Sequence, residues 1–362
     1  MIDKDEWLNT PEPIEDPSPE YKILGDPDKE HREAAWRIAI GLQDVDHLRP
    51  SEYLIEVANQ NIAGDINSLE ARKMIDEYHH LKKTNESDAR TSEADLVASR
   101  INCEIQSRTY SFNPPSFLSL HYQLFHGIYK FAGKIRDYNI SKSEWVLNGD
   151  SVSYGRADKC RETLYYDIEQ AMQFKFEIIE DKVFLKKVAN FISNLWQNHV
   201  FGEGNTRTCA VFLIEYLKGF GFDYVNNDMF EKYSWYFRNA LVRANYDNPA
   251  KGIRATTYYL ERFLENLMFG TKHELHNRDI HVNNIQIAKA FDVPSASANE
   301  LTMFELRVLE QIKKDPEIKQ AEIAKKVGRS LRTVKSLTKS LSDKGAIKRE
   351  NGKRYGYWVI KI

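Results

Sequence analysis

The chain has 362 residues, 42% of them hydrophobic, and its 51 lysines and arginines nearly balance 53 aspartates and glutamates, giving a net charge of −2. That length fits two or three domains, and the apolar content excludes a chain that is disordered throughout. No window approaches the ~20 uninterrupted apolar residues of a membrane span, and the first residues lack the pattern of a signal peptide. Three cysteines cannot form a disulfide framework. We therefore expect a soluble, cytoplasmic, multi-domain protein with no membrane partner.

The first segment, residues 1–30, holds five of the eleven prolines, and ten acidic residues against three basic ones. Proline at that density disfavours both helix and sheet. This segment is predicted to be an acidic tail, either solvated or strapped over another domain.

Residues 31–85 carry apolar residues at helical spacing, with a break at Pro50 before Ser51, which can cap a new helix. The pattern predicts a small bundle of two or three short helices. The sequence NESDARTSEAD, residues 85–95, follows with few apolar side chains. It is predicted to be a linker or an exposed loop.

The largest unit is predicted over residues 100–270, which are rich in aromatic residues and mostly helical in pattern. Phe184 and Val188 begin an apolar stripe along a helix that ends near His199. Between residues 137 and 154 the apolar period shortens towards two around an Asn-Gly turn. That change predicts a short β-hairpin.

The most informative segment is HVFGEGNTRT, residues 199–208, which joins two predicted helices. Gly202 and Gly204 permit positive φ values, so backbone amides can point into one concavity. The N-terminus of the second helix lies directly behind that concavity and favours an anion there.

The polar side chains of this segment suit a nucleotide phosphate. Asn205 can donate hydrogen bonds, and Arg207 brings a forked cation that matches phosphate oxygens. Glu203 would repel phosphates unless a metal lies between them, and Mg²⁺ binds in that manner. His199 is a candidate general base near neutral pH. A purely structural turn is also open, in which His199 caps a carbonyl and Glu203 pairs with Arg207.

Written as His-x-Phe-x-Glu-Gly-Asn-x-Arg, the segment resembles the signature of the Fic (filamentation-induced-by-cAMP) family. The runs FLSLH at residues 117–121 and FHGIYKFAGKIR at residues 125–136 resemble the family's lead-in to its flap, so the similarity spans roughly residues 100–270. The resemblance implies a mainly helical fold with a small β-hairpin flap. It also implies AMP transfer from ATP, with Mg²⁺, to a Ser, Thr or Tyr hydroxyl of a protein target or of the enzyme itself.

The family's residue roles carry over to the matching positions. His199 would take the proton from the target hydroxyl, and Glu203 would hold Mg²⁺. The residues expected to bind the ATP phosphates are Gly202, Gly204, Asn205, Thr206 and Arg207. The flap residues expected to dock the target are Asn139, Ile140, Ser141 and Trp145. Tyr236 and Asn239 follow at the distance of the family's adenine contacts, although core packing is the simpler explanation for both.

Two positions depart from the family pattern. Thr206 replaces a glycine, and Ala210 replaces a second arginine that the family uses for the γ-phosphate and for autoinhibition. We expect weaker ATP binding or a different pose. Two alternatives stay open: a non-enzymatic, nucleotide-sensing transcriptional regulator, and a Fic-fold enzyme that transfers another phosphate-containing group. Gly204 favours nucleotidyl transfer, because the kinase-like subfamily lacks glycine there.

The helices of residues 31–85 resemble the small antitoxins that inhibit Fic toxins, here fused in cis. Asp46 stands where the inhibitory motif has glutamate, one methylene short, and Ala210 would offer it no cation. We therefore expect this inhibitory lock to be weak or absent. The alternative is that these helices only pack on the core.

Residues 271–297 are polar and are expected to be a linker to a different unit, residues 298–362. From Lys319 to Ile362 there are thirteen lysines and arginines against three acidic residues. Three amphipathic helices and two strands across an Asn-Gly turn resemble a winged helix-turn-helix.

The basic residues of this last unit suit contact with the phosphate backbone of DNA. The candidates are Arg329, Arg332, Lys335, Lys339, Lys353 and Arg354. A docking or dimerisation module is the alternative, because fold does not determine function. DNA and a second copy of the chain are therefore both open as partners.

Overall fold

The computed structural model describes residues 27–81, 86–107, 111–173, 181–220, 222, 228–284, 303–327, 331–350 and 356–361. The predicted acidic tail lies almost wholly outside these ranges. Among the helices that are described, none is both long and apolar enough to cross a membrane.

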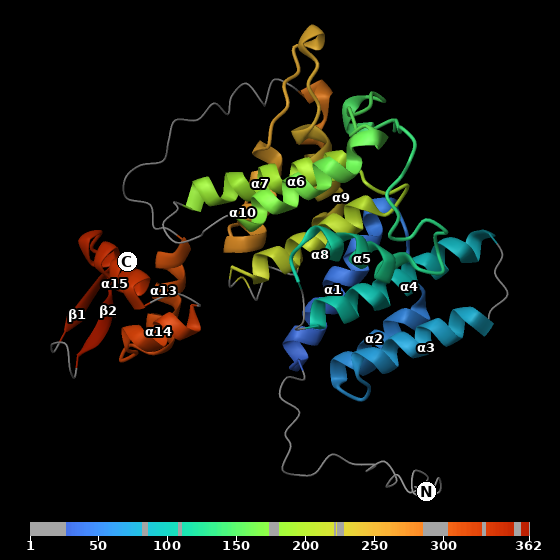
Figure 1. Ribbon diagram of the computed structural model, residues 1–362. Coiled ribbons are helices and arrows are strands. Elements are labelled where there is room, and N and C mark those ends of the chain that lie inside the picture. Colours follow the sequence, from blue (N-terminus) through green and yellow to red (C-terminus); the bar gives the residue numbers. More distant parts are fainter. Residues whose placement is uncertain are drawn as a thin grey trace, which may run out of the picture.

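The larger unit is a set of helices packed around one hydrophobic core (Figure 1). Its α-helices are α1 (Lys29–Gly41), α2 (Glu52–Ala63), α3 (Ser68–Leu81), α4 (Glu86–Gln106), α5 (Pro114–Phe125), α6 (Cys160–Met172), α7 (Asp181–Asn198), α8 (Asn205–Lys218), α9 (Asp228–Ala244), α10 (Tyr258–Phe269) and α11 (Asn277–Ile280). Short 3-10 helices lie between them, namely η1 (Leu42–Asp46), η2 (Trp145–Leu147), η3 (Ala157–Lys159), η4 (Pro249–Lys251) and η5 (Val282–Asn284).

Helix α8 is the central helix of this unit. Every residue from Asn205 to Leu217 is buried, and α4, α5, α7 and η1 all pack against it. The loop that enters α8 is therefore surrounded by protein on several sides, which restricts its conformation.

The N-terminal helices share this core. Trp36 and Leu42 are buried in it, and α1 packs against both α4 and α9. The α1–α9 contact is very close, because a Cβ on Gly41 would lie 2.4 Å from the carbonyl oxygen of Phe230. This packing carries η1, which directly follows α1, up to the start of α8.

The prediction of a loop over residues 85–95 is wrong, because Glu86 to Asp95 form the first half of α4. Asp95 is fully buried and accepts hydrogen bonds from the backbone N and the Oγ of Ser51, at 2.8 and 2.5 Å. It also pairs with His79 Nε2 at 2.8 Å. Polar side chains of this stretch thus make buried tertiary contacts, which hydropathy cannot reveal.

The hairpin predicted over residues 137–154 is instead an irregular loop around η2, and these residues, all of them described, contain no strand. Glu144 N donates to Asp150 O at 2.9 Å, and Gly149 N donates to Glu144 O at 3.0 Å. Ser143 Oγ also donates to Gly149 O at 3.1 Å. The turn was therefore predicted in the right place, but hydrogen bonds local to the turn replace a β-ladder.

Residues 271–284, the first half of the predicted linker, pack on the larger unit. Leu275 and Ile280 are buried in its core, and α11 contacts α9. Residues 285–297 lie outside the described ranges.

The smaller unit has its own core. Its elements are α13 (Met303–Lys314), α14 (Gln320–Lys326), α15 (Leu331–Asp343), β1 (Ile347–Glu350) and β2 (Tyr357–Ile360). The two strands pair antiparallel, with Ile347 opposite Ile360. Trp358 anchors the sheet, because its Nε1 donates to Ile318 O at 3.1 Å. The predicted fold class, mainly helical with a helix and hairpin unit at the C-terminus, is confirmed.

Candidate active site

The loop between α7 and α8 turns through two residues of left-handed conformation, His199 with φ of 47° and Gly204 with φ of 79°. Glycine is needed at position 204 for a second reason, because a Cβ there would lie 2.6 Å from the Phe125 ring. At Gly202 a Cβ would lie 2.6 Å from the hydroxyl of Tyr138. Both glycines therefore let neighbouring aromatic rings press against the loop.

Arg136 holds the backbone at the start of this loop. Its Nε donates to His199 O at 2.7 Å, and its backbone N donates to Val200 O at 2.9 Å. The rest of its guanidinium donates to further carbonyls, those of Tyr138, Gly155 and Asn198. A buried cation thus satisfies several carbonyls that the turn would otherwise leave unpaired. Sequence reasoning quoted Arg136 only as part of a family run and missed this role.

Asn205 braces the loop from its other end. Phe201 N donates to Asn205 Oδ1 at 3.0 Å, and Asn205 Nδ2 donates to Phe201 O at 2.8 Å. Thr206 is used in the same way, since its Oγ1 accepts from Trp196 Nε1 at 2.9 Å. The two side chains were predicted to bind phosphate, but in this structure their polar groups are committed to the protein itself.

His121 fixes the position of Glu203. Gly133 N donates to His121 Nδ1 at 2.8 Å, so Nε2 carries the proton and donates to Glu203 O at 2.9 Å. The ring also stacks on Phe201, with centroids 3.6 Å apart. Burial lowers the pKa of His121 from 6.5 to about 4, which keeps this imidazole neutral and the bond to Glu203 intact.

His199 is only 9% exposed and packs beside the ring of Tyr154 at 4.5 Å. Its Nδ1 lies 3.3 Å from Trp196 O, so the proton sits on Nδ1 and Nε2 is left able to accept one. Burial and, to a lesser extent, the charge of Lys142 lower the pKa of His199 to about 3. The carbonyl-capping role considered for His199 is therefore present and leaves Nε2 unprotonated, but this nitrogen is a weaker base than the near-neutral one expected from the sequence.

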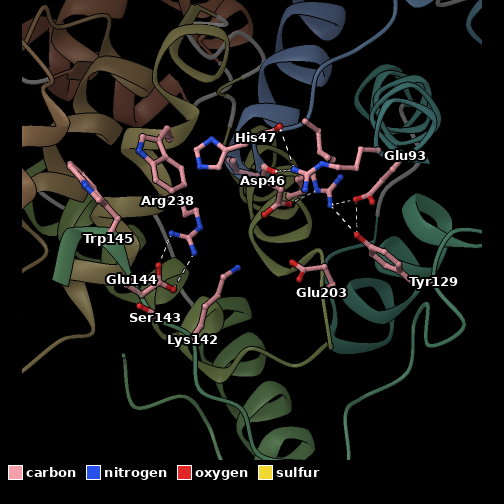
Figure 2. Close-up of a pocket in the computed structure, with 15 residues that line it drawn as sticks. Asp46, His47, Glu93, Tyr129, Lys142, Ser143, Glu144, Trp145, Glu203 and Arg238 are labelled. Carbon is pink, nitrogen blue, oxygen red and sulfur yellow. Dashed lines mark hydrogen bonds and ion pairs between the residues drawn. The ribbon is translucent and has the colours of Figure 1, made fainter. Parts of the chain in front are cut away.

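A hollow of about 650 Å³ opens beside the loop (Figure 2). Its walls come from η1 and the two residues after it, α4, Tyr129, the loop before η2, the motif segment and α9. Of the motif residues, Glu203 and Arg207 line the hollow. The others predicted to act there lie outside its lining, namely His199, Gly202, Gly204, Asn205 and Thr206.

Arg207 is completely buried in the wall of this hollow. Its Nη2 donates to Glu93 Oε1 at 2.6 Å and to Tyr129 Oη at 3.3 Å, and its Nη1 donates to Gln43 Oε1 at 3.2 Å. Asp46 Oδ2 lies 3.0 Å from Nε, in an ion pair without hydrogen-bond geometry. Burial alone would lower the pKa of Arg207, but the surrounding carboxylates outweigh it and raise the pKa.

The expectation that Asp46 would find no cation is wrong. Sequence reasoning paired it with position 210, but Ala210 is buried within α8 and the packing of η1 brings Asp46 to Arg207 instead. The second carboxylate, Glu93, comes from the stretch predicted to be a loop. In this conformation Arg207 is therefore engaged by the N-terminal helices, and a phosphate could reach it only after displacing Asp46 or Glu93.

A second buried arginine closes the opposite wall of the hollow. Arg238 Nη1 and Nη2 donate to the two carboxylate oxygens of Glu144 at 2.7 and 3.1 Å, and both side chains are at most 5% exposed. Tyr154 Oη also donates to Glu144 Oε1 at 2.9 Å. Tyr154 in turn packs on the ring of His199. The Arg238–Glu144 pair therefore connects α9 to the candidate base through Tyr154.

The two adenine candidates do not line the hollow. Tyr236 is 3% exposed, and Asn239 is fully buried with its Nδ2 donating to Asn277 Oδ1 at 2.8 Å. Core packing therefore accounts for both residues. Their neighbour Trp235 lines the hollow instead, and its ring lies 4.4 Å from that of His47.

The predicted docking residues lie on the loop before η2. Asn139 and Ser141 are exposed, Ile140 is half-buried, and Asn139 Oδ1 accepts from Ala157 N at 2.9 Å. Trp145 is 52% exposed and meets the ring of His281 edge-on at 4.8 Å. No strand is formed in this segment, and docking of the target by these residues remains a prediction.

In the smaller unit, Lys335 and Lys339 are exposed on α15, one helical turn apart. They therefore share one face of the helix. The side chains of the other DNA-binding candidates, Arg329, Arg332, Lys353 and Arg354, fall outside the described part of the chain.

Comparison with known proteins agrees with both units. Residues 111–217 match the Fic/DOC family, and residues 304–348 match a winged helix-turn-helix DNA-binding family. The chain is also similar to a Fic family protein from Desulfovibrio desulfuricans G20, with 10% sequence identity and a TM-score of 0.37 over 90% of this chain and 87% of that chain. So low a score adds nothing to the family match.

The larger unit thus contains a segment that matches the Fic/DOC family, and the smaller unit a segment that matches winged helix-turn-helix DNA-binding proteins. A Fic/DOC domain supports a transferase activity of the Fic type. Neither family match covers the N-terminal helices, so their likeness to antitoxins stays a prediction.

Proposed function

We propose that this protein transfers AMP from ATP to a hydroxyl side chain of a protein target or of itself. The observation that supports this most is the tautomer of His199, a neutral imidazole whose Nε2 can accept a proton, in the same short loop as Glu203. The adjoining hollow of about 650 Å³ falls in the range of pockets that hold small molecules.

In the proposed reaction His199 Nε2 takes the proton of the target hydroxyl. The freed oxygen forms a bond to the α-phosphorus while the bond to the bridging oxygen of pyrophosphate breaks, and pyrophosphate leaves. The protein contributes chiefly position and charge in such a transfer. The Arg136 and Asn205 contacts hold the loop for this, because they fix the backbone carbonyls of Asn198, His199 and Phe201.

Glu203 is the residue that would hold Mg²⁺. Its carboxylate lines the hollow, accepts only the neighbouring Gly204 N at 3.3 Å, and has no ion-pair partner among the described residues. No three described His, Cys, Asp or Glu side chains converge on one metal position, so a metal would take its remaining ligands from phosphate and water. When bound, Mg²⁺ supplies charge neutralisation at the phosphate oxygens.

Labelled ATP tests the proposal directly. The full-length protein with Mg²⁺ should become labelled from [α-³²P]ATP and not from [γ-³²P]ATP, and His199→Ala should abolish the label. His80→Ala, which changes an exposed histidine of α3 outside the hollow, is the matched control and should label normally. Label from the γ-phosphate alone would indicate phosphate transfer instead. No label in the wild type or in Asp46→Ala would favour the non-enzymatic, nucleotide-sensing regulator, which the engaged state of Arg207 keeps open.

We also propose that the winged helix-turn-helix domain contacts DNA through the exposed face of α15. The domain match and the exposed Lys335 and Lys339 support this. In a mobility-shift assay, binding should weaken from low to moderate salt, since phosphate contacts release counterions. The double change Lys335→Glu with Lys339→Glu should weaken it further. Lys313→Glu on α13 is the control, and binding that ignores both salt and the double change would contradict the proposal.

A further inference from the structure

Most of the cations that line the hollow are already engaged. Arg207 is held by two carboxylates and Arg238 by its bidentate partner. Arg90 Nη2 donates to the carbonyl oxygen of Asp46 at 3.0 Å. Within the described lining of the hollow, this leaves Lys142 as the cation whose ammonium group has neither an ion pair nor a hydrogen bond.

The position of Lys142 is that of a ligand-binding group. It belongs to the loop before η2, is exposed, and extends into the hollow on the side that faces Glu203 (Figure 2). Of the charges that act on the buried imidazole of His199, that of Lys142 has the largest effect on its pKa. The charge of Lys142 therefore acts at the base as well as in the hollow.

A triphosphate in this hollow would need such a cation. Ala210 is buried and carries no charge, and Arg207 is held by its carboxylate partners. Lysine serves elsewhere as a point charge for phosphate, with three donors on a flexible stem. The side chain of Lys142 is long and its ammonium group has no partner among the described residues, so it can contact phosphate oxygens that approach Glu203.

We propose that Lys142 is a phosphate-binding residue of the hollow and supplies the positive charge that position 210 lacks. The inference rests on the proposed function in one respect, since it takes the hollow to be the nucleotide site. It adds that the loop expected to dock the protein target also holds the nucleotide, so that one segment contacts both substrates.

Calorimetric titration of the full-length protein with ATP, and separately with adenosine, tests this without turnover. A hydrogen bond to a charged group contributes enough that Lys142→Met should raise the Kd for ATP by about tenfold. Lys142→Arg should restore most of the affinity, and adenosine binding should not change. Lys134→Met is the matched control, because this exposed lysine lies on the preceding turn and outside the hollow.

Each outcome decides the inference. An ATP affinity within about twofold of the wild type in Lys142→Met overturns it, even if the variant labels a protein target more slowly, because the lysine would then contact the target. No ATP binding to the wild type or to Asp46→Ala overturns both the inference and AMP transfer. Weakened ATP binding in Lys142→Met, without α-phosphate labelling of the wild type, supports the phosphate site and rejects AMP transfer.

Discussion

The two buried arginines of the hollow are held in different ways. Arg238 and Glu144 form a bidentate pair in which both side chains are nearly inaccessible, at 5% and 1%. Arg207 is equally buried, but its partners Asp46 and Glu93 are 20% and 17% exposed. Glu144 and Arg207 lie within the residues that match the Fic/DOC family, whereas Arg238 follows that match and Asp46 and Glu93 precede it in the chain.

The difference in burial has a physical consequence. An ion pair withdrawn from water must keep both partners, since the charge left behind cannot be solvated. Carboxylates that still touch water can leave an arginine at lower cost, but Arg207 itself is fully buried, so another anion must take their place. The Arg238 pair is therefore a fixed structural connection, and the Arg207 contacts are suited to be displaced.

The largest effect should come from breaking the fixed pair. Glu144→Gln leaves Arg238 buried without a countercharge and weakens the acceptor for Tyr154 Oη, and the expected loss is about 3–5 kcal/mol of unfolding free energy. Urea denaturation measures it. The exposed pair of Asp247 and Arg254 provides the control, and Asp247→Asn should change stability by less than about 1 kcal/mol. Equal losses in the two variants would remove the distinction between fixed and displaceable pairs.

Per pH unit, a titration should show a smaller effect, since each arginine lowers the pKa of a nearby buried histidine. Burial dominates in both cases, with Arg207 adding to it at His121 and Arg238 at His199, and the pKa values fall from 6.5 to about 4 and about 3. The unfolded chain therefore binds more protons than the folded chain below pH 6.5. Stability should be complete above that pH and should fall by about 1.4 kcal/mol per pH unit for each imidazole as the pH drops towards 4.

Urea denaturation at pH 7 and pH 5 measures this slope. His121→Gln removes one of the two titrating groups, and it should flatten the slope even if the variant is less stable at pH 7. His80→Ala, which removes an exposed imidazole, should leave the slope as it is. A slope that does not respond to His121→Gln would contradict the assignment of a neutral, buried His121.

The motif segment shows what local sequence can predict here. The spacing of Phe184 and Val188 indicated α7, and the glycines indicated a turn through positive φ, which Gly204 adopts and Gly202 does not. These features depend on interactions between residues that are close in the chain, so they can be predicted from a single sequence. The winged helix-turn-helix was predicted on the same basis, from helical periodicity and an Asn-Gly turn.

The partners of Arg207 could not be predicted in this way. Glu93 lies in a polar stretch whose helical character depends on burying residues such as Asp95 against Ser51 and His79, far away in the chain. Asp46 reaches Arg207 only because α1 packs tightly against α9. The adenine candidates lie outside the hollow because of their position around the helix, since one residue along a helix turns the side chain by about 100°. That step separates buried Tyr236 from Trp235 in the hollow.

The smallest effect concerns the displaceable contacts, and it should appear in rate rather than in stability. Asp46→Ala removes one carboxylate from Arg207 and leaves Glu93 and Tyr129 in place, so the fold should survive. The released Nε edge can then face the phosphates of ATP. We expect self-labelling from [α-³²P]ATP to rise about tenfold, equivalent to about 1.4 kcal/mol in the barrier. The initial rate of labelling measures it.

Asp44→Ala is the matched control for this change. Asp44 belongs to the same 3-10 helix, but its partner is Arg49, which is 78% exposed, and it does not line the hollow. A rise in Asp46→Ala with no rise in Asp44→Ala would identify the contact with Arg207, rather than general loosening of η1, as the restraint on the enzyme. Equal labelling rates in Asp46→Ala and wild type would contradict this. The contact with Asp46 would then not restrain the enzyme, and the partly exposed carboxylates that pair with Arg207 would not differ in function from the buried carboxylate that pairs with Arg238.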